Sequence, residues 1–189
     1  TLSASSAASD VYKRQGEVAI TMPNYINKVI NEFPGKLRNL TQASPNSPKL
    51  FEVRKEAKDL DPENAKIFHR LVAQLLYISK RSRPDLAPSV PFLTTRVCKP
   101  SEDDWKKLRM VIEYLKQTKD LPLILKVDKT KPDVWSIDAA YAVHADCKSH
   151  TGGSFTMGHE SFLSISCKQK TNCKSSCEAE LVAVDDCIG

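Results

Sequence analysis

The chain has 189 residues, of which 41% are hydrophobic and 27% are charged, and its formal net charge is +5. This length suits one good core or two small ones, because single domains usually have roughly 100 to 200 residues. No uninterrupted apolar run approaches the roughly 18 residues of a membrane helix, and the six cysteines form no CxxC pair. The composition therefore predicts a soluble protein with reduced thiols, and its charge favours a polyanionic partner.

The first fifteen residues, TLSASSAASDVYKRQ, are small and polar. They have too little to bury to offset the entropy of ordering themselves, so we expect a disordered tail over residues 1–15. The string also resembles the translation of a sequencing-library adapter, which would make it an assembly artefact. A natural serine-rich leader is the alternative.

Helical signals dominate the stretch that follows. A short strand is expected at 16–22, then a helix that starts at Pro23 and Asn24, and then a loop up to residue 49 that is rich in proline. Asp61 and Pro62 supply an N-cap and a first-turn proline for the clearest helix, which ends before Pro84. Ser101 and Asp104 form a capping box for a second amphipathic helix, and we expect the two helices to pack together.

After Thr118 the hydrophobic period changes from helical to extended. Four short runs, at 121–127, 134–140, 153–158 and 162–166, are separated by turn residues, so we expect an antiparallel meander. Ser175 and Glu178 then match another capping box. The helix that they open would place one apolar face toward the core, made of Cys177, Leu181, Val184 and Ile188.

Acidic residues in the second half are the candidates for chemistry. Asp138 lies in an apolar strand, where a charged carboxylate is costly unless it is compensated, although it could simply point to solvent. Glu178 and Glu180 lie roughly 200° apart around the helix axis and cannot face the same site. Helix geometry alone leaves the choice between these two glutamates open.

Four segments of the chain, 71–97, 104–125, 136–153 and 166–186, resemble the C-terminal part of a copia-type retroelement reverse transcriptase. They read LVAQLLYISKRSRPDLAPSVPFLTTRV, DWKKLRMVIEYLKQTKDLPLIL, SIDAAYAVHADCKSHTGG and SCKQKTNCKSSCEAELVAVDD. The resemblance implies an α/β (α+β) chain with a helical thumb- and connection-like region at 16–118. Residues 119–189 would be the first part of an RNase H-like domain, with a three-stranded meander and its first helix.

The same resemblance implies the site. The family has a catalytic Asp on the first strand, which matches Asp138. The family's helical Glu is the first residue of a motif that reads EL-x-A-hydrophobic. Residues 180–184 match this motif, so the resemblance implies Glu180 as the helical acid and Glu178 as its outward neighbour. Such acids hold Mg²⁺ or Mn²⁺ ions about 4 Å apart, so we expect the two carboxylates to lie within roughly 8 Å of each other.

The resemblance also implies an incomplete site. The family's other aspartates would lie beyond Gly189 and the polymerase palm would lie upstream, so we expect a truncated chain with weak or absent metal binding and no efficient activity alone. The helical pair Asp185 and Asp186 does not match the polymerase aspartates, which sit on a hairpin turn.

Two basic groups are candidates for contacts with an RNA/DNA hybrid or duplex. Lysines just before the last helix could hold a phosphate together with the helix start. Solvated, charge-rich loops are the alternative for both groups. The candidates are Lys168, Lys170, Ser175 and Ser176 in the first group, and Lys80, Arg81, Arg83 and Arg96 in the second.

Other interpretations carry less weight. Zinc binding by His144, His150, Cys147, Cys173 and Cys177 is disfavoured, because buried thiols at an N-cap need no metal. A non-catalytic nucleic-acid-binding remnant is the main alternative to a polymerase fragment, and a structural piece of a retroelement particle is the second. The expected partners are nucleic acid and the remainder of a Pol polyprotein, inside a cytoplasmic particle or the nucleus, without a membrane.

Overall fold

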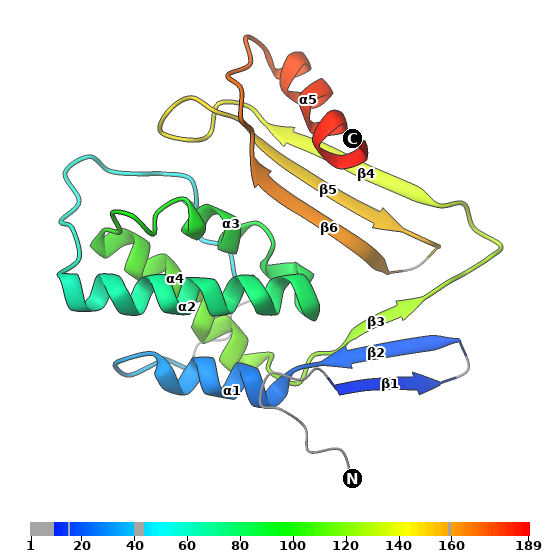
Figure 1. Ribbon diagram of the computed structural model, residues 1–189, viewed down its shortest axis with the longest axis horizontal. Coiled ribbons are helices and arrows are strands. Elements are labelled where there is room, and N and C mark those ends of the chain that lie inside the picture. The colour runs from blue at the N-terminus through cyan, green and yellow to red at the C-terminus, as the bar shows by residue number, and fades with distance from the viewer. Residues whose placement is uncertain (1–9, 15, 40–43, 159) are drawn as a thin grey trace.

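The computed structural model describes residues 10–14, 16–39, 44–158 and 160–189, and it combines helices with two small antiparallel sheets (Figure 1). This mixture agrees with the expected α+β class. Within the described ranges, no helix is both long and apolar enough to cross a membrane. The elements are β1 (Asp10–Arg14), β2 (Glu17–Thr21), α1 (Pro23–Glu32), α2 (Pro62–Arg81), η1 (Pro84–Leu86), α3 (Ser89–Thr94), α4 (Glu102–Gln117), β3 (Leu123–Lys126), β4 (Val134–Ala140), β5 (His150–Thr156), β6 (Ser161–Lys168) and α5 (Ser176–Ile188).

Helices α1 to α4 enclose the main hydrophobic core. Local signals start the two long ones as predicted: Asp61 accepts hydrogen bonds from the amides of the first turn of α2, and Ser101 and Asp104 form the reciprocal capping box of α4. Side chains at helical spacing then meet between the helices. The fully buried ones include Ile26, Val29, Phe68, Leu71, Leu75, Ile78, Leu86, Leu93, Leu108 and Ile112.

The first sheet has the order β1-β2-β3 and corrects two expectations. Residues 10–14 form a strand instead of a disordered tail, whereas residues 1–9 lie outside the described residues. The run expected to start the meander, β3, pairs with β2 instead of β4. The physical reason is that β3 follows α4 directly and covers the second edge of β2, which would otherwise expose unpaired amides and carbonyls.

The second sheet is the antiparallel meander β4-β5-β6 (Figure 1). Helix α5 packs on one face of this sheet, and the helical part, which consists of α1 to α4 and the segments between them, lies on the other. In the register, Ile137 is opposite Gly153 and Asp138 is opposite Gly152. A Cβ added to Gly153 would collide with the sulfur of Cys187 in α5, so this position faces the helix. Because side chains alternate along a strand, Ile137 faces α5 and Asp138 faces away from it.

The inward face of α5 differs from the expected one. Ala179, Ala183 and Cys187 are buried against the sheet, whereas Leu181 is 67% exposed and Ile188 is 63% exposed. The helix face with small side chains packs inward because the helix lies directly over Gly153, where no large side chain fits between the two backbones. The prediction that Cys177, Leu181, Val184 and Ile188 face the core is therefore wrong.

A buried arginine ties the end of α2 to the end of α4. Arg83 is 1% exposed; its Nε and Nη2 donate to the Asp85 carboxylate at 3.0 and 2.7 Å. Nη1 donates to the carbonyl of Thr118 at 2.8 Å, and Nη2 donates to the Thr118 hydroxyl at 2.7 Å. The hydroxyl of Tyr114 donates to the same Asp85 at 2.9 Å, and the guanidinium lies over the Tyr114 ring. These hydrogen bonds offset the free-energy cost of burying the Arg83 guanidinium charge.

Replacing Arg83 by Met should lower the free energy of unfolding by about 3 kcal/mol, because it leaves the Thr118 carbonyl without its buried donor and leaves Asp85 with only the Tyr114 hydroxyl. Urea unfolding followed by circular dichroism measures the change. Arg81→Met, two residues earlier and exposed, is the matched control and should change stability by less than about 0.5 kcal/mol. Equal, small effects of both substitutions would contradict the structural role of Arg83.

Adjacent glycines in β5 provide a second test. Gly153→Ala should destabilise the fold by about 1–3 kcal/mol through overpacking against Cys187, whereas the Cβ of Gly152→Ala meets nothing closer than the Asp138 carbonyl at 3.8 Å. Thermal unfolding of the two variants measures the difference. Adding Cys187→Ala to Gly153→Ala should recover part of the loss. Equal tolerance at both positions would show that α5 does not lie over Gly153.

Candidate functional site

A cleft of about 520 Å³ lies between the second sheet and the helical part. The sheet wall is polar, because every outward position of the meander near its middle carries a serine, a glycine or an acid. The opposite wall is formed by Phe51, by the η1 residues Pro84 and Asp85, and by Ala87 and Pro88. The sheet residues that line the cleft are Ser136, Ile137, Asp138, Ala140, His150, Gly152, Gly153, Ser154, Ser164, Ile165 and Ser166.

Asp138 lies on the first strand of the meander, as expected, and its side chain is exposed at this cleft. Its strand neighbours Ile137 and Ala139 are half-buried under α5. The alternation of β4 thus resolves the question that the sequence left open, since Asp138 occupies the polar side of the strand. The carboxylate can accept hydrogen bonds from a polar or cationic group that enters the cleft.

Glu180 lies on α5, also as expected, and it is half-buried. However, α5 packs on the face of the sheet opposite to the one that carries Asp138. The expected approach of the Asp138 and Glu180 carboxylates to within roughly 8 Å stays a prediction. Among the described residues, no group of three or more histidine, cysteine, aspartate or glutamate side chains could hold a metal ion. The assignment of Asp138 and Glu180 to catalysis and to metal binding therefore stays a prediction.

A buried polar network positions α5 on the sheet. The side-chain amide of Gln169, which is 1% exposed, donates to the Thr151 hydroxyl at 3.1 Å and to the carbonyl of Ala179 at 2.9 Å. Thr151 in turn donates to the Asp186 carboxylate at 2.7 Å, and the Cys173 thiol donates to the Gln169 oxygen at 3.2 Å. The sequence did not predict this network, because Thr151, Gln169 and Asp186 are each of a type that is usually found on the surface. The network fixes the helix at its first and last turns.

Three of the basic candidates have partners within the fold. Arg83 is buried and bonded as described above, so the prediction that it contacts nucleic acid is wrong. Arg96 donates to Asp104 at 3.2 Å, and Lys168 donates to Asp146 at 2.6 Å. The Lys168 ammonium also lowers the pKa of Asp146. These two side chains would have to leave their partners to contact a phosphate.

The remaining basic candidates are open to solvent. Lys80, Arg81 and Lys170 are exposed, and Arg81 lies over the ring of Tyr77. Burial and the Asp186 carboxylate raise the pKa of the Cys167 thiol in the second sheet, and the Lys80 charge opposes them.

At the start of α5, the Ser175 hydroxyl accepts from the amide of Glu178 at 3.2 Å, and Ser176 is exposed. The Glu178 carboxylate accepts from the amide of Lys174, instead of closing the box at Ser175. The amides of Lys174 and Glu178 are therefore already hydrogen-bonded within the chain, and they would have to give up these bonds to hold a phosphate.

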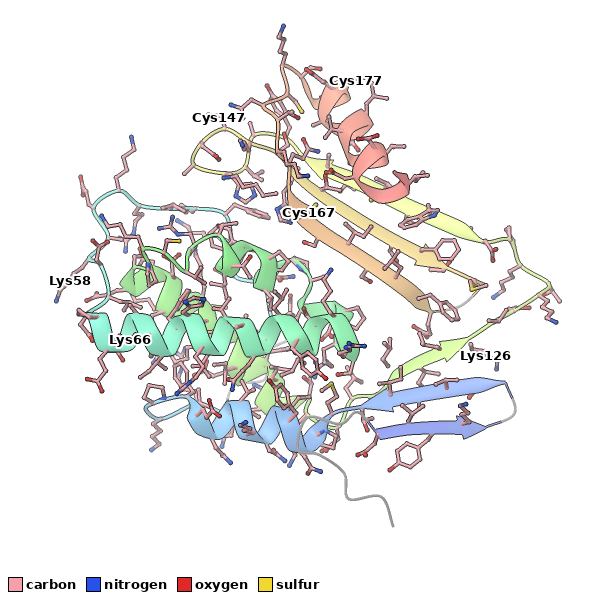
Figure 2. All side chains as sticks on the ribbon, in the orientation of Figure 1. Lys58, Lys66, Lys126, Cys147, Cys167 and Cys177 are labelled. Carbon is pink, nitrogen blue, oxygen red and sulfur yellow. The ribbon has the colours of Figure 1, made fainter. Side chains whose placement is uncertain are left out.

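The zinc interpretation gains no support among the described residues. Figure 2 shows Cys147 in the loop that follows β4, Cys177 on α5 and Cys167 on β6, at separate places in the molecule. All six cysteines are free, and no group of three potential ligands is found in the described part of the chain. His144 and His150 do lie together, but their other neighbours are Phe51, Phe92 and Ser166.

Comparison with known proteins finds retrotransposon relatives. The chain is 27% identical over 144 residues to a transposon Ty5-1 protein of Saccharomyces cerevisiae. It is 33% identical over 139 residues to the retrovirus-related Pol polyprotein from transposon RE2 of Arabidopsis thaliana. It is also 26% identical over 186 residues to the transposon Ty1-DR6 Gag-Pol polyprotein of Saccharomyces cerevisiae. No family model matches the chain, and no solved structure matches it.

These alignments cover most of the chain but small parts of the relatives. They span 75%, 73% and 94% of this chain, and 45%, 9% and 11% of the three relatives, in the order given. The identities are low, although the Ty1 alignment takes in both the helical part and the meander. The homologues of this chain are thus retrotransposon polyproteins, which supports its origin in a retroelement Pol polyprotein.

Proposed function

We propose that this chain comes from the reverse transcriptase and RNase H region of a retrotransposon polyprotein, and that the described residues bind an RNA/DNA hybrid or duplex without cleaving it efficiently. The observation that carries the proposal is the order β4-β5-β6-α5, with Asp138 on the first strand and Glu180 on the following helix. This order agrees with what the resemblance implies for the start of an RNase H-like fold. The similarity to Gag-Pol polyproteins over 94% of the chain supports the remainder of such a polyprotein as a partner.

The geometry favours binding over cleavage. Mg²⁺ or Mn²⁺ in a two-ion site activates water and stabilises the leaving oxygen, and this requires carboxylates that converge on ions roughly 4 Å apart. Asp138 faces the cleft, whereas Glu180 belongs to a helix on the other side of the sheet. With the two acids arranged in this way, we assign no cleavage step to them.

Electrostatics supports a nucleic-acid partner. The net charge of +5 attracts a polyanion, and Lys80, Arg81 and Lys170 are exposed. Lys80 and Arg81 end α2, where their charges also interact favourably with the negative end of the helix dipole. Contacts with phosphates from such side chains give affinity without sequence preference, and the affinity falls as salt rises.

Removing both charges at the end of α2 should weaken binding to a labelled RNA/DNA hybrid and flatten its salt dependence. If Lys80 and Arg81 each contact one phosphate, the slope of log affinity against log salt should fall by roughly 1.8 in the Lys80→Ala, Arg81→Ala variant, because each contact contributes about 0.9. Fluorescence anisotropy over a series of salt concentrations gives the slope.

The matched control is the Lys58→Ala, Lys66→Ala variant, which removes the same charge. Figure 2 labels both of these lysines, and Lys66 lies roughly 21 Å from Lys80 along α2 at 1.5 Å per residue. Equal losses of slope in the two variants would show that net charge alone acts, and a wild-type affinity that is independent of salt would contradict nucleic-acid binding. Robust hybrid cleavage that Asp138→Asn abolishes would show that the chain is a working nuclease.

A further inference from the structure

Two histidines meet where the second sheet contacts the helical part. His144, from the loop after β4, and His150, at the start of β5, are each 6% exposed. Nε2 of His144 lies 3.0 Å from Nδ1 of His150, and Nε2 of His150 lies 2.8 Å from the hydroxyl of Ser166. One proton between the facing nitrogens makes a hydrogen bond, whereas a proton on each of them would leave two donors opposed. The contact therefore requires that the pair is not fully protonated.

Aromatic rings from the helical part close over this pair. The ring of Phe51 lies 5.2 Å from that of His144 and 5.1 Å from that of His150, measured between centroids. Phe92 of α3, which belongs to the main core, stacks on His144 at 6.2 Å. These four rings join the sheet to the helices beside the cleft that His150 also lines. The four rings therefore belong to the boundary between the two parts of the molecule.

The charges around the pair disfavour its protonation. Burial, and then the Lys168 ammonium, lower the pKa of His144, and Asp146 acts weakly in the other direction. The Asp146 carboxylate already accepts from Lys168 at 2.6 Å. Burial, and then the His144 charge, lower the pKa of His150 to about 4.

The surrounding elements contribute further charges. Lys107 of α4 lies 4.5 Å from the centre of the Phe92 ring, which adds a second cation on the helical side. Asp85 and Asp138 line the same cleft as His150, and Asp85 is bonded to Arg83. Of these charges, that of Lys168 lowers the pKa of His144 in the same direction as burial.

We propose that His144 and His150 form a pH-sensitive latch, which holds the second sheet against the helices while the rings are neutral and releases it when they take up protons. Release would expose Phe51 and open the cleft that Asp138 lines. The proposal concerns how the two parts of the fold are joined, and it does not depend on nucleic-acid binding or on catalysis.

The direction of the effect follows from linkage. In the released state His150 regains an ordinary pKa near 6.5, whereas in the closed state its pKa is about 4. Between these values the released state binds more protons, so the closed state is fully favoured above pH 6.5 and is progressively lost as the pH falls toward 4. For His150 alone, the ratio of released to closed molecules should rise roughly 30-fold from pH 7.5 to pH 5.

Amide hydrogen exchange of the whole chain tests the latch, with protection factors corrected for the intrinsic pH dependence of exchange. From pH 7.5 to pH 5, protection should fall roughly 30-fold in peptides that cover Phe51 and β6, and it should stay constant in the core of α2. The His144→Gln, His150→Gln variant should lose this pH response. His69→Gln, which replaces an exposed histidine on α2, should keep it.

Two results would overturn the proposal: equal protection of the wild-type boundary at both pH values, or an unchanged pH response in the double variant. If the double variant does not fold, histidine titration of the wild-type chain by NMR decides the question. Protonation of His150 near pH 6.5 without any change in boundary protection would refute the latch. Protonation well below that value, together with loss of protection, would support it.

Discussion

The side-chain alternation of strand β4 decides which groups of this molecule can act together. Opposed residues of an antiparallel ladder share a face, and the register pairs Ile137 with Gly153 and Asp138 with Gly152. Because Gly153 lies under Cys187 of α5, Ile137 must pack beneath the helix and Asp138 must face the cleft. A slip of one residue would reverse both placements and put the carboxylate into the apolar layer. The same ladder therefore protects the packing of α5 and separates Asp138 from Glu180.

Much of the helical part follows from local sequence. The N-cap Asp61 and the capping box of Ser101 and Asp104 start helices where they were expected, because these signals depend only on residues three or four positions apart. The pairing of β3 with β2 could not be predicted in this way, since the two strands are about a hundred residues apart and each run is equally apolar. The division between the two parts at residue 118, which the resemblance implies, stays a prediction.

The inward face of α5 shows a different limit of sequence reasoning. Large apolar residues at helical spacing normally mark the buried face, yet here Ala179 and Ala183 are buried and Leu181 is exposed. The deciding partner is the flat glycine-containing stretch of β5, which helical periodicity cannot reveal. Likewise, the charge of Arg83 resembles that of Arg81 in the sequence, and only the position of Asp85 and Thr118 explains why one is buried and the other exposed.

The two acids assigned to the site were predicted in the right elements, whereas their joint role stays a prediction. Asp138 lies on the first strand of the meander and Glu180 on the helix that follows it. The contact between His144 and His150 was not predicted, because the sequence offered these residues only as members of a zinc site that was disfavoured. Their aromatic surroundings come from Phe51 and Phe92, which are distant in the sequence. Long-range packing, not the local motif, determines what this pair can do.

The outer face of α5 affects how the polypeptide behaves in concentrated solution. Leu181, Val184 and Ile188 form an apolar strip with 67%, 43% and 63% of their surfaces exposed. Water solvates such a strip poorly, and it adheres to other apolar surfaces. Sulfate strengthens this adhesion because it is excluded from the protein surface, and cooling weakens the adhesion because apolar hydration carries a large heat capacity. Ammonium sulfate should therefore bring the protein out of solution early, and chilled buffers of low salt should keep it dispersed.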